Sequence, residues 1–181
     1  MAKIGLRNLR YSKLDTSDNV TTASNFGKAI DCKVSIEKNS AELHADDGLA
    51  ESDYSFKKGT IDLTVDDEGE TFADVLGHQT SADGEVVRSD NDVAPYVAIG
   101  RILTKQVNGV KSYKVEFLHK VKFSEPNADE KTKGESIEFG TSAISGVIHK
   151  LANGNWSKYK TFTTYEEAST YLDGLLTASS T

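Results

Sequence analysis

The sequence has a single cysteine, Cys32, and only two prolines among 181 residues. One cysteine forms neither an internal disulfide nor a multi-thiolate metal site, which is typical of a reducing compartment. The chain also has no run approaching the ~20 apolar residues that a membrane span needs, and its first residues lack the apolar core of a signal peptide. We therefore expect a protein that stays in the cytosol where it is made and has no membrane partner.

Motifs that carry catalysis are missing as well. The sequence has no Gly-x-Ser-x-Gly nucleophile elbow, no Gly-rich phosphate-binding loop and no dinucleotide-binding fingerprint. The four histidines, His44, His78, His119 and His149, lie too far apart in sequence for a short metal-binding motif. We expect no catalytic residue, no metal and no cofactor, and we do not expect an enzyme. Two distant carboxylates brought together by the fold, as in glycoside hydrolysis, stay open.

Charge is strongly segregated along the chain, although the formal net charge is only −7. Residues 61–99 carry ten acidic side chains against Arg88 alone, a net charge of −9, whereas residues 100–160 carry eleven basic against six acidic side chains, a net charge of +5. Two interpretations stay open: neighbouring faces of one molecule screen each other, or the acidic face of one copy meets the basic face of the next. Nucleic-acid binding is not expected as a primary role, because the acidic chain lacks the basic surface that phosphate binding requires.

Alternation of apolar and polar residues predicts strands over much of the chain. In the clearest stretch, 112–123, one face would hold Tyr113, Val115, Phe117, Val121 and Phe123. Residues 96–103 are apolar on both faces apart from Arg101, which indicates a central strand. Further strands are predicted at 4–14, 32–36, 61–65 and 136–148.

Turn and helix signals complete the fold prediction. Asn108-Gly109, Asp83-Gly84 and Asn153-Gly154 are hairpin signals. Helical spacing predicts a short helix at 70–77, after which His78 would cap the last carbonyls, and a capping box at Thr164 predicts a C-terminal helix. The expected fold class is mainly β, an antiparallel sandwich or barrel with a short flanking helix, a long loop and a C-terminal helix.

The long loop is expected at 39–58, which has few large apolar side chains and several acidic ones. A loop of this length in a compact domain is usually functional or disordered. The expected domain organisation is a β-sandwich domain over 1–150 and a C-terminal extension with a helix over 151–181.

Four spaced stretches resemble the major tail proteins of long-tailed phages and prophages of Gram-positive bacteria, in the same order as in that family. They are ADDGLAE (45–51) followed by the strand 59–65, VLGH (75–78), DVAPYVAIG (92–100), and FSEP (123–126) running into KTKGESIEF (131–139). The similarity extends from about residue 4 to about residue 148, and the segment after Lys150 looks more variable.

The resemblance implies a structural virion protein with a tail-tube β-sandwich. Subunits of this family form hexameric rings that stack into a hollow tail tube, the conduit for DNA ejection. The implied partners are further copies of the chain and the tape measure, tail terminator and tail tip proteins, with DNA passing through the lumen without specific binding. The implied location is the virion tail, assembled in the host cytoplasm.

Two sets of residues are candidates for these roles. A neutral or acidic bore would let DNA slide, because lysines and arginines would hold its phosphates. Candidates for the lumen-facing surface are the polar residues of two alternating strands: Lys33, Ser35, Glu37, Thr60, Asp62, Thr64 and Asp66. Candidates for contacts between subunits or rings lie in the expected loop: Glu42, His44, Asp46, Asp47, Glu51, Asp53, Tyr54 and Phe56.

Two alternatives to a phage tail tube stay open. One is a soluble β-sandwich that binds a glycan or a protein, for which Trp156 and Tyr159 would supply an aromatic platform. The other is the tube of a phage-derived bacteriocin.

Overall fold

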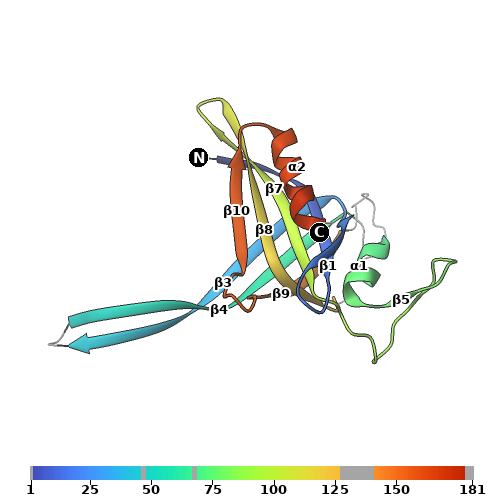
Figure 1. Ribbon diagram of the computed structural model, residues 1–181, viewed down its shortest axis with the longest axis horizontal. Coiled ribbons are helices and arrows are strands. Elements are labelled where there is room, and N and C mark those ends of the chain that lie inside the picture. Colours follow the sequence, from blue (N-terminus) through green and yellow to red (C-terminus); the bar gives the residue numbers. More distant parts are fainter. Residues whose placement is uncertain (1, 46–47, 67–68, 127–140, 178–181) are drawn as a thin grey trace, which may run out of the picture.

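The structure is a computed structural model that describes residues 2–45, 48–66, 69–126 and 141–177 (Figure 1). In these residues the chain is mainly β, and the predicted mainly antiparallel fold class is confirmed. The elements are β1 (Ala2–Leu14), β2 (Val20–Asn25), β3 (Ala29–Ala45), β4 (Gly48–Val65), α1 (Gly69–Leu76), β5 (Gln79–Thr80), β6 (Val86–Val87), β7 (Val97–Val107), β8 (Val110–Ser124), β9 (Ser142–His149), β10 (Ser157–Phe162) and α2 (Tyr165–Leu176). No described helix is long and apolar enough to cross a membrane.

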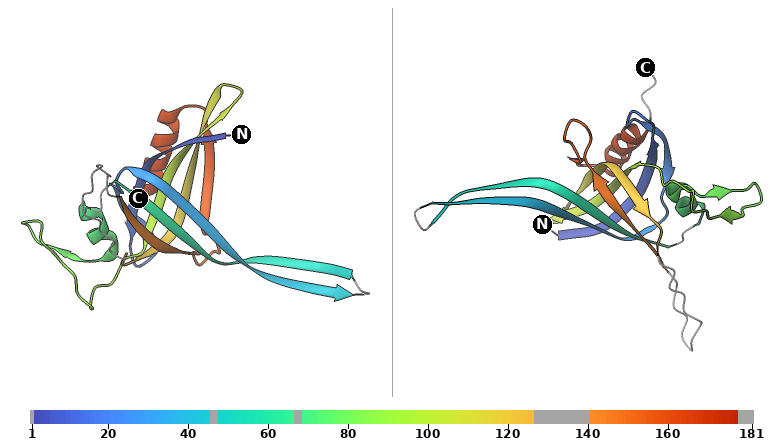
Figure 2. Two further views of the ribbon diagram at one scale, coloured as in Figure 1. Left: turned by 180° about the vertical axis from the view of Figure 1, so that it is seen from behind. Right: turned by 90° about the horizontal axis from the view of Figure 1, so that it is seen from below.

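One antiparallel sheet, in the order β2-β1-β7-β8-β9-β4-β3, forms the body of the molecule. The sheet curls, so that β1, β7 and β8 pack across a shared core from β3, β4 and β9 (Figures 1 and 2). The core holds fully buried side chains from both layers, among them Leu9, Phe26, Ile61, Leu63 and Ile144. Because strand side chains alternate between faces, one set of apolar residues per strand is enough to fill this core.

A bulge in β8 divides that strand between two hydrophobic clusters. Val97 pairs with Val121 and Ile99 pairs with Leu118, so β8 has one extra residue between its two partners. The single apolar face predicted for 112–123 is therefore corrected. Val115 and Phe117 pack in a second cluster under α2, whereas Leu118, Val121 and Phe123 face the main core.

Helix α2 covers the outer face of β7 and β8 (Figure 1). Thr164 caps it as predicted, accepting a hydrogen bond from the backbone N–H of Glu167. Ala168, Leu172 and Leu176 of α2 pack on Ala98 and Ile102 of β7. The main core covers the other face of β7. The strand predicted at 96–103 is therefore apolar on both faces because each face is buried in a different cluster.

Helix α1 matches the helix predicted at 70–77 and closes one end of the main core. Its Phe72, Val75 and Leu76 are buried there, as their helical spacing requires. Gly77 follows with φ +80°, and a Cβ at this position would lie 2.3 Å from the carbonyl oxygen of Val93. Only glycine fits this helix end, which turns the chain toward β5 and β6.

Two of the three predicted hairpin turns connect paired strands. Asn108 and Gly109, both at positive φ, join β7 to β8, and Asp83-Gly84 lies between the short paired strands β5 and β6. The third prediction is corrected, because β10 pairs with β8 and not with β9. Asn153-Gly154 forms a small excursion closed by the hydrogen bond from Leu151 N–H to Asn155 C=O. The chain then rejoins β8, so that β9 pairs with Lys120–Ser124 and β10 with Tyr113–Leu118.

Candidate assembly surfaces

The expected loop at 39–58 is instead the outer half of a long β-hairpin. β3 and β4 pair from Ala29↔Val65 out to Ala45↔Gly48. Beyond Lys38 and Phe56 the two strands form a ribbon that projects from the body (Figures 1 and 2). The eight residues 38–45 correspond to about 26 Å of strand. We call this ribbon, residues 38–56, the arm.

Six of the eight candidates for contacts between subunits or rings lie on the arm. Pairing places Glu42 opposite Ser52, Leu43 opposite Glu51, and His44 opposite Leu49. Asp53 pairs with Ala41, and Tyr54 with Ser40. Asp46 and Asp47 lie outside the described residues. As far as the described residues go, the arm strands pair with each other and with no third strand.

The root of the arm is fixed to the body by an aromatic pair. Phe56 of β4 stacks on Trp156, with ring centroids 5.2 Å apart and ring planes 17° apart. Trp156 is half-buried against the main core, and its carbonyl accepts a hydrogen bond from His119 N–H. The excursion between β9 and β10 therefore supplies the side chain that sets the direction of the arm. Trp156 is thus half-buried against Phe56, whereas Tyr159, the other residue of the aromatic platform considered above, is 71% exposed.

Six of the seven lumen candidates lie on the outer face of β3 and β4. Their neighbours in the same strands, such as Val34, Ile61 and Leu63, pack inward. Cross-strand pairing puts Lys33 beside Asp62, and Ser35 beside Thr60. The remaining two, Glu37 and Thr64, lie at either end of this face.

The same face continues across β9 to the end of β8. Asp62 pairs with Ser145, whose hydroxyl donates to its carboxylate at 2.7 Å, and Ser145 pairs in turn with Ser124. Thr60 pairs with Val147, which pairs with Lys122. We call this surface of β3, β4, β9 and the end of β8 the polar face. Its side chains are mainly small hydroxyls and charges of both signs, with the exposed apolar Val147 among them.

Asp66 is the exception among the lumen candidates. It lies one residue beyond β4, where its carboxylate accepts a hydrogen bond from Lys28 N–H at 3.0 Å and its own N–H donates to the Lys28 carbonyl at 3.1 Å. Asp66 therefore holds the chain that enters β3, a role that alternation along the strand does not indicate.

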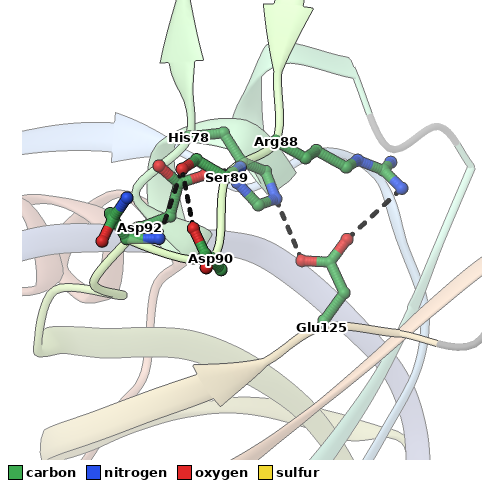
Figure 3. Close-up of polar contacts among 7 residues, drawn as sticks. His78, Arg88, Ser89, Asp90, Asp92 and Glu125 are labelled. Atoms are coloured by element: carbon green, nitrogen blue, oxygen red, sulfur yellow. Dashed lines mark hydrogen bonds and ion pairs between the residues drawn. The ribbon is translucent and has the colours of Figure 1, made fainter.

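A polar cluster centred on His78 was not predicted from the sequence (Figure 3). His78 Nδ1 lies 2.7 Å from Asp92 Oδ2, and Nε2 lies 2.9 Å from Glu125 Oε2. Arg88 reaches the other oxygen of Glu125 at 3.3 Å. Both ring nitrogens donate at the same time only in the imidazolium form, so a charged His78 would bridge the two carboxylates.

The cluster ties the segment 79–92 to the body. The backbone N–H of Ser89 and the His78 ring hydrogen-bond to Asp92 and hold the pKa of its carboxyl below its usual value. The predicted capping role of the His78 side chain is corrected: its backbone N–H bonds to the carbonyl of Ala73, and its ring turns to Asp92 and Glu125. His78 thus fixes one end of the segment to the end of β8.

A second network fills the space between the two layers. Arg101 of β7 donates to Glu116 of β8 through Nε and Nη2, at 3.1 and 2.6 Å, and also contacts the carbonyl and sulfur of Cys32. Lys114 donates to the other oxygen of Glu116 at 2.5 Å. Burial alone would raise the pKa of Glu116, but the hydrogen bonds from Lys114 and Arg101 outweigh it and hold that pKa below its usual value.

The described residues include no group of three or more His, Cys, Asp or Glu side chains placed to hold a metal ion. Compared with known proteins, the sequence matches no protein-family model and no curated protein.

Proposed function

We propose that this protein is a structural subunit that assembles into stacked hexameric rings, the tail tube of a long-tailed phage. The observation that carries the proposal is the arm, a two-stranded ribbon that projects from a compact body (Figure 1). An isolated two-stranded hairpin is at best marginally stable in water. An arm of this kind gains its stability from a surface on another molecule.

The ends of the sheet support the same conclusion. β2 and β3 are its terminal strands, and β10 ends the branch on β8. Terminal strands offer unpaired backbone groups, which compact proteins usually protect and which assembling proteins use as joints. Edge pairing between neighbouring copies would join six sheets into one closed wall.

The polar face is the surface that we assign to the bore of this tube. It presents hydroxyls of Ser35, Thr60 and Ser145 between charges of both signs. The charges include Lys33 and Lys122 as well as Asp62 and Glu37. A mixed surface of this kind offers DNA no continuous row of cations, so few counterions would be released on contact and DNA would slide.

Electron microscopy of the purified chain tests the proposal. Negative-stain images and sedimentation velocity over a range of protein and salt concentrations should show hollow tubes or six-membered rings. The matched variant replaces residues 40–54 by Asn-Gly, which closes a short hairpin between Asn39 and Ser55. It should unfold at nearly the temperature of the unmodified chain and yet form no tubes.

Two outcomes would contradict the proposal. A chain that stays monomeric even with its tape measure and tail tip partners is not a tube subunit. Tubes formed by the shortened variant would show that the arm is not the joint.

A further inference from the structure

We propose that an acidic flap, residues 79–92, binds the basic β10 edge of the next copy of this chain and so sets the head-to-tail order of subunits in a ring. This inference rests on the proposed function and names the contact within the ring. It decides between the two interpretations of the segregated charge in favour of contact between copies.

The flap presents carboxylates without cationic partners. It includes β5, β6 and the turn between them, and it projects from the body beside α1 (Figure 1). Asp83, Glu85 and Asp90 are all exposed. Within the described part of the chain, none of the three forms an ion pair, whereas Arg88 and Asp92 are used to anchor the flap at Glu125 and His78.

The β10 edge presents the opposite charge. Lys158 and Lys160 are exposed on β10, and Lys111 is exposed at the start of β8 nearby. Lys158 and Lys160 contact aromatic rings: Lys158 lies 5.1 Å from the Phe117 ring centroid, and Lys160 lies 5.1 Å from that of Phe162. No carboxylate lies within ion-pair distance of these three lysines in the residues that the structure describes. Burial lowers the pKa of Lys158.

The flap and the β10 edge of one molecule are too far apart to neutralise each other. The flap is fixed at Glu125, beyond the end of β8, whereas Tyr159 in the middle of β10 pairs with Glu116. Nine residues of strand correspond to about 30 Å. Charges screen over about 8 Å at physiological ionic strength, so the two charged surfaces do not interact within one chain. Figure 1 shows β5 and β10 on opposite sides of the body.

Complementary charges on opposite sides of a subunit favour a heterologous contact, in which the flap of one copy meets the edge of the next. Such a contact repeats from copy to copy and closes into a ring when the rotation allows it. The flap therefore fits a second copy of this chain as its partner, with the carboxylates of Asp83 and Glu85 facing Lys158 and Lys160.

A charge-swap experiment tests this contact. The flap variant Asp83→Lys/Glu85→Lys would carry lysines on both surfaces, and the edge variant Lys158→Glu/Lys160→Glu would carry acids on both. Each variant alone should associate at least about tenfold more weakly than the unmodified chain in sedimentation velocity at low salt, because like charges then face each other. An equimolar mixture should recover association, because each flap then finds an edge of opposite charge in an alternating, even-numbered ring.

A matched control keeps the test specific. The variant Asp31→Lys/Glu166→Lys reverses two exposed acids outside the flap and keeps the native flap and β10 edge, so it should associate on its own like the unmodified chain. If the flap and edge variants both associate like the unmodified chain, the inference is overturned and Lys158 and Lys160 only protect a strand edge. The same holds if each variant alone is weakened and their mixture stays dissociated.

The two proposals fail in different ways. Rings in electron micrographs that persist in both charge variants would leave the tail-tube proposal standing and remove this contact. Salt-sensitive association that follows the charge swap, without rings or tubes under any condition, would support the contact between copies and contradict the tail-tube proposal. An unmodified chain that stays monomeric at every concentration and salt, even with its tape measure and tail tip partners, would exclude both proposals.

Discussion

Phe56 and Trp156 stack at 5.2 Å, although they are a hundred residues apart in the sequence. One belongs to the strand that becomes the arm, and the other to the excursion between β9 and β10. The excursion reaches this position because β10 returns to β8, and so the C-terminal part of the chain controls the direction of the arm.

We therefore expect Phe56→Ala to loosen the arm at its root. The free energy of unfolding should fall by about 1 kcal/mol, since aromatic pairs of this kind are worth roughly that much beyond their buried area, and tube formation should require a higher protein concentration. Urea unfolding and light scattering measure the two effects. Val93→Ala is the control, because this side chain is 73% exposed and should change stability little. Equal losses in both variants would contradict a specific role for the pair.

The contribution of His119 and His149 to stability should fall as the pH drops below about 6.5. Burial lowers the pKa of His119, with Lys158 nearby, and burial together with Lys120 and Lys122 lowers that of His149. A histidine whose pKa is lower in the folded chain takes up protons preferentially when unfolded, so its contribution to stability is complete above the ordinary value of 6.5 and is lost as the pH falls through that range.

Urea midpoints measured between pH 7.5 and 5.5 check this expectation. The double variant His119→Gln/His149→Gln should have a flatter pH dependence than the unmodified chain. Asp92 and Glu116 do not contribute to the pH dependence between pH 7.5 and 5.5. Their pKa values are held below the usual range, so both carboxyls stay ionised throughout this interval. An unchanged slope in the double variant would refute the assignment.

The Arg101–Glu116 pair should be costly to break on one side only. Glu116→Gln leaves Arg101 and Lys114 charged in a space where little water reaches them, and we expect a loss of about 3 kcal/mol in chemical denaturation. Arg101→Met/Glu116→Met removes both partners of the pair and should be closer to the unmodified chain than Glu116→Gln. The opposite order of stabilities would show that the buried network contributes little to the free energy of unfolding.

Two glycines near α2 should respond in opposite directions to alanine. A Cβ at Gly100 would lie 2.2 Å from Leu172 Cδ1, so Gly100→Ala should displace α2 and lower stability by about 1–3 kcal/mol. Gly174 lies inside α2 with open space around its Cβ position, and Gly174→Ala should raise stability by up to about 1 kcal/mol. Thermal unfolding measures both, and a destabilised Gly174→Ala would contradict the helix packing described above.

Local signals were enough for most elements of the fold. Thr164 caps α2, Asn108-Gly109 turns β7 into β8, and the apolar residues of 70–77 bury one face of α1, because each of these features depends on neighbours within a few residues. The predicted strand at 136–148 matches β9 only from Ser142, and its first residues lie partly outside the described chain.

Features that depend on distant partners were missed. The change of face in β8 arises from its register with β7, which alternation within 112–123 does not contain. Asn153-Gly154 gives the same local turn whether the next strand pairs with β9 or with β8. The contacts of His78 join residues 14 and 47 positions apart. The sequence does contain a hairpin signal for the arm, because Asp47-Gly48 is a dipeptide typical of hairpin turns. The low apolar content of 39–58 nevertheless favoured a loop over two strands.

The bulge in β8 also limits how the chain can change in length. Deleting one residue at His119 or Lys120 would restore regular pairing with β7 and exchange the inward and outward side chains of half the strand. Either Val115 and Phe117 would leave α2, or Val121 and Phe123 would leave the main core. Homologous sequences should therefore keep the count of residues between Phe117 and Val121 fixed.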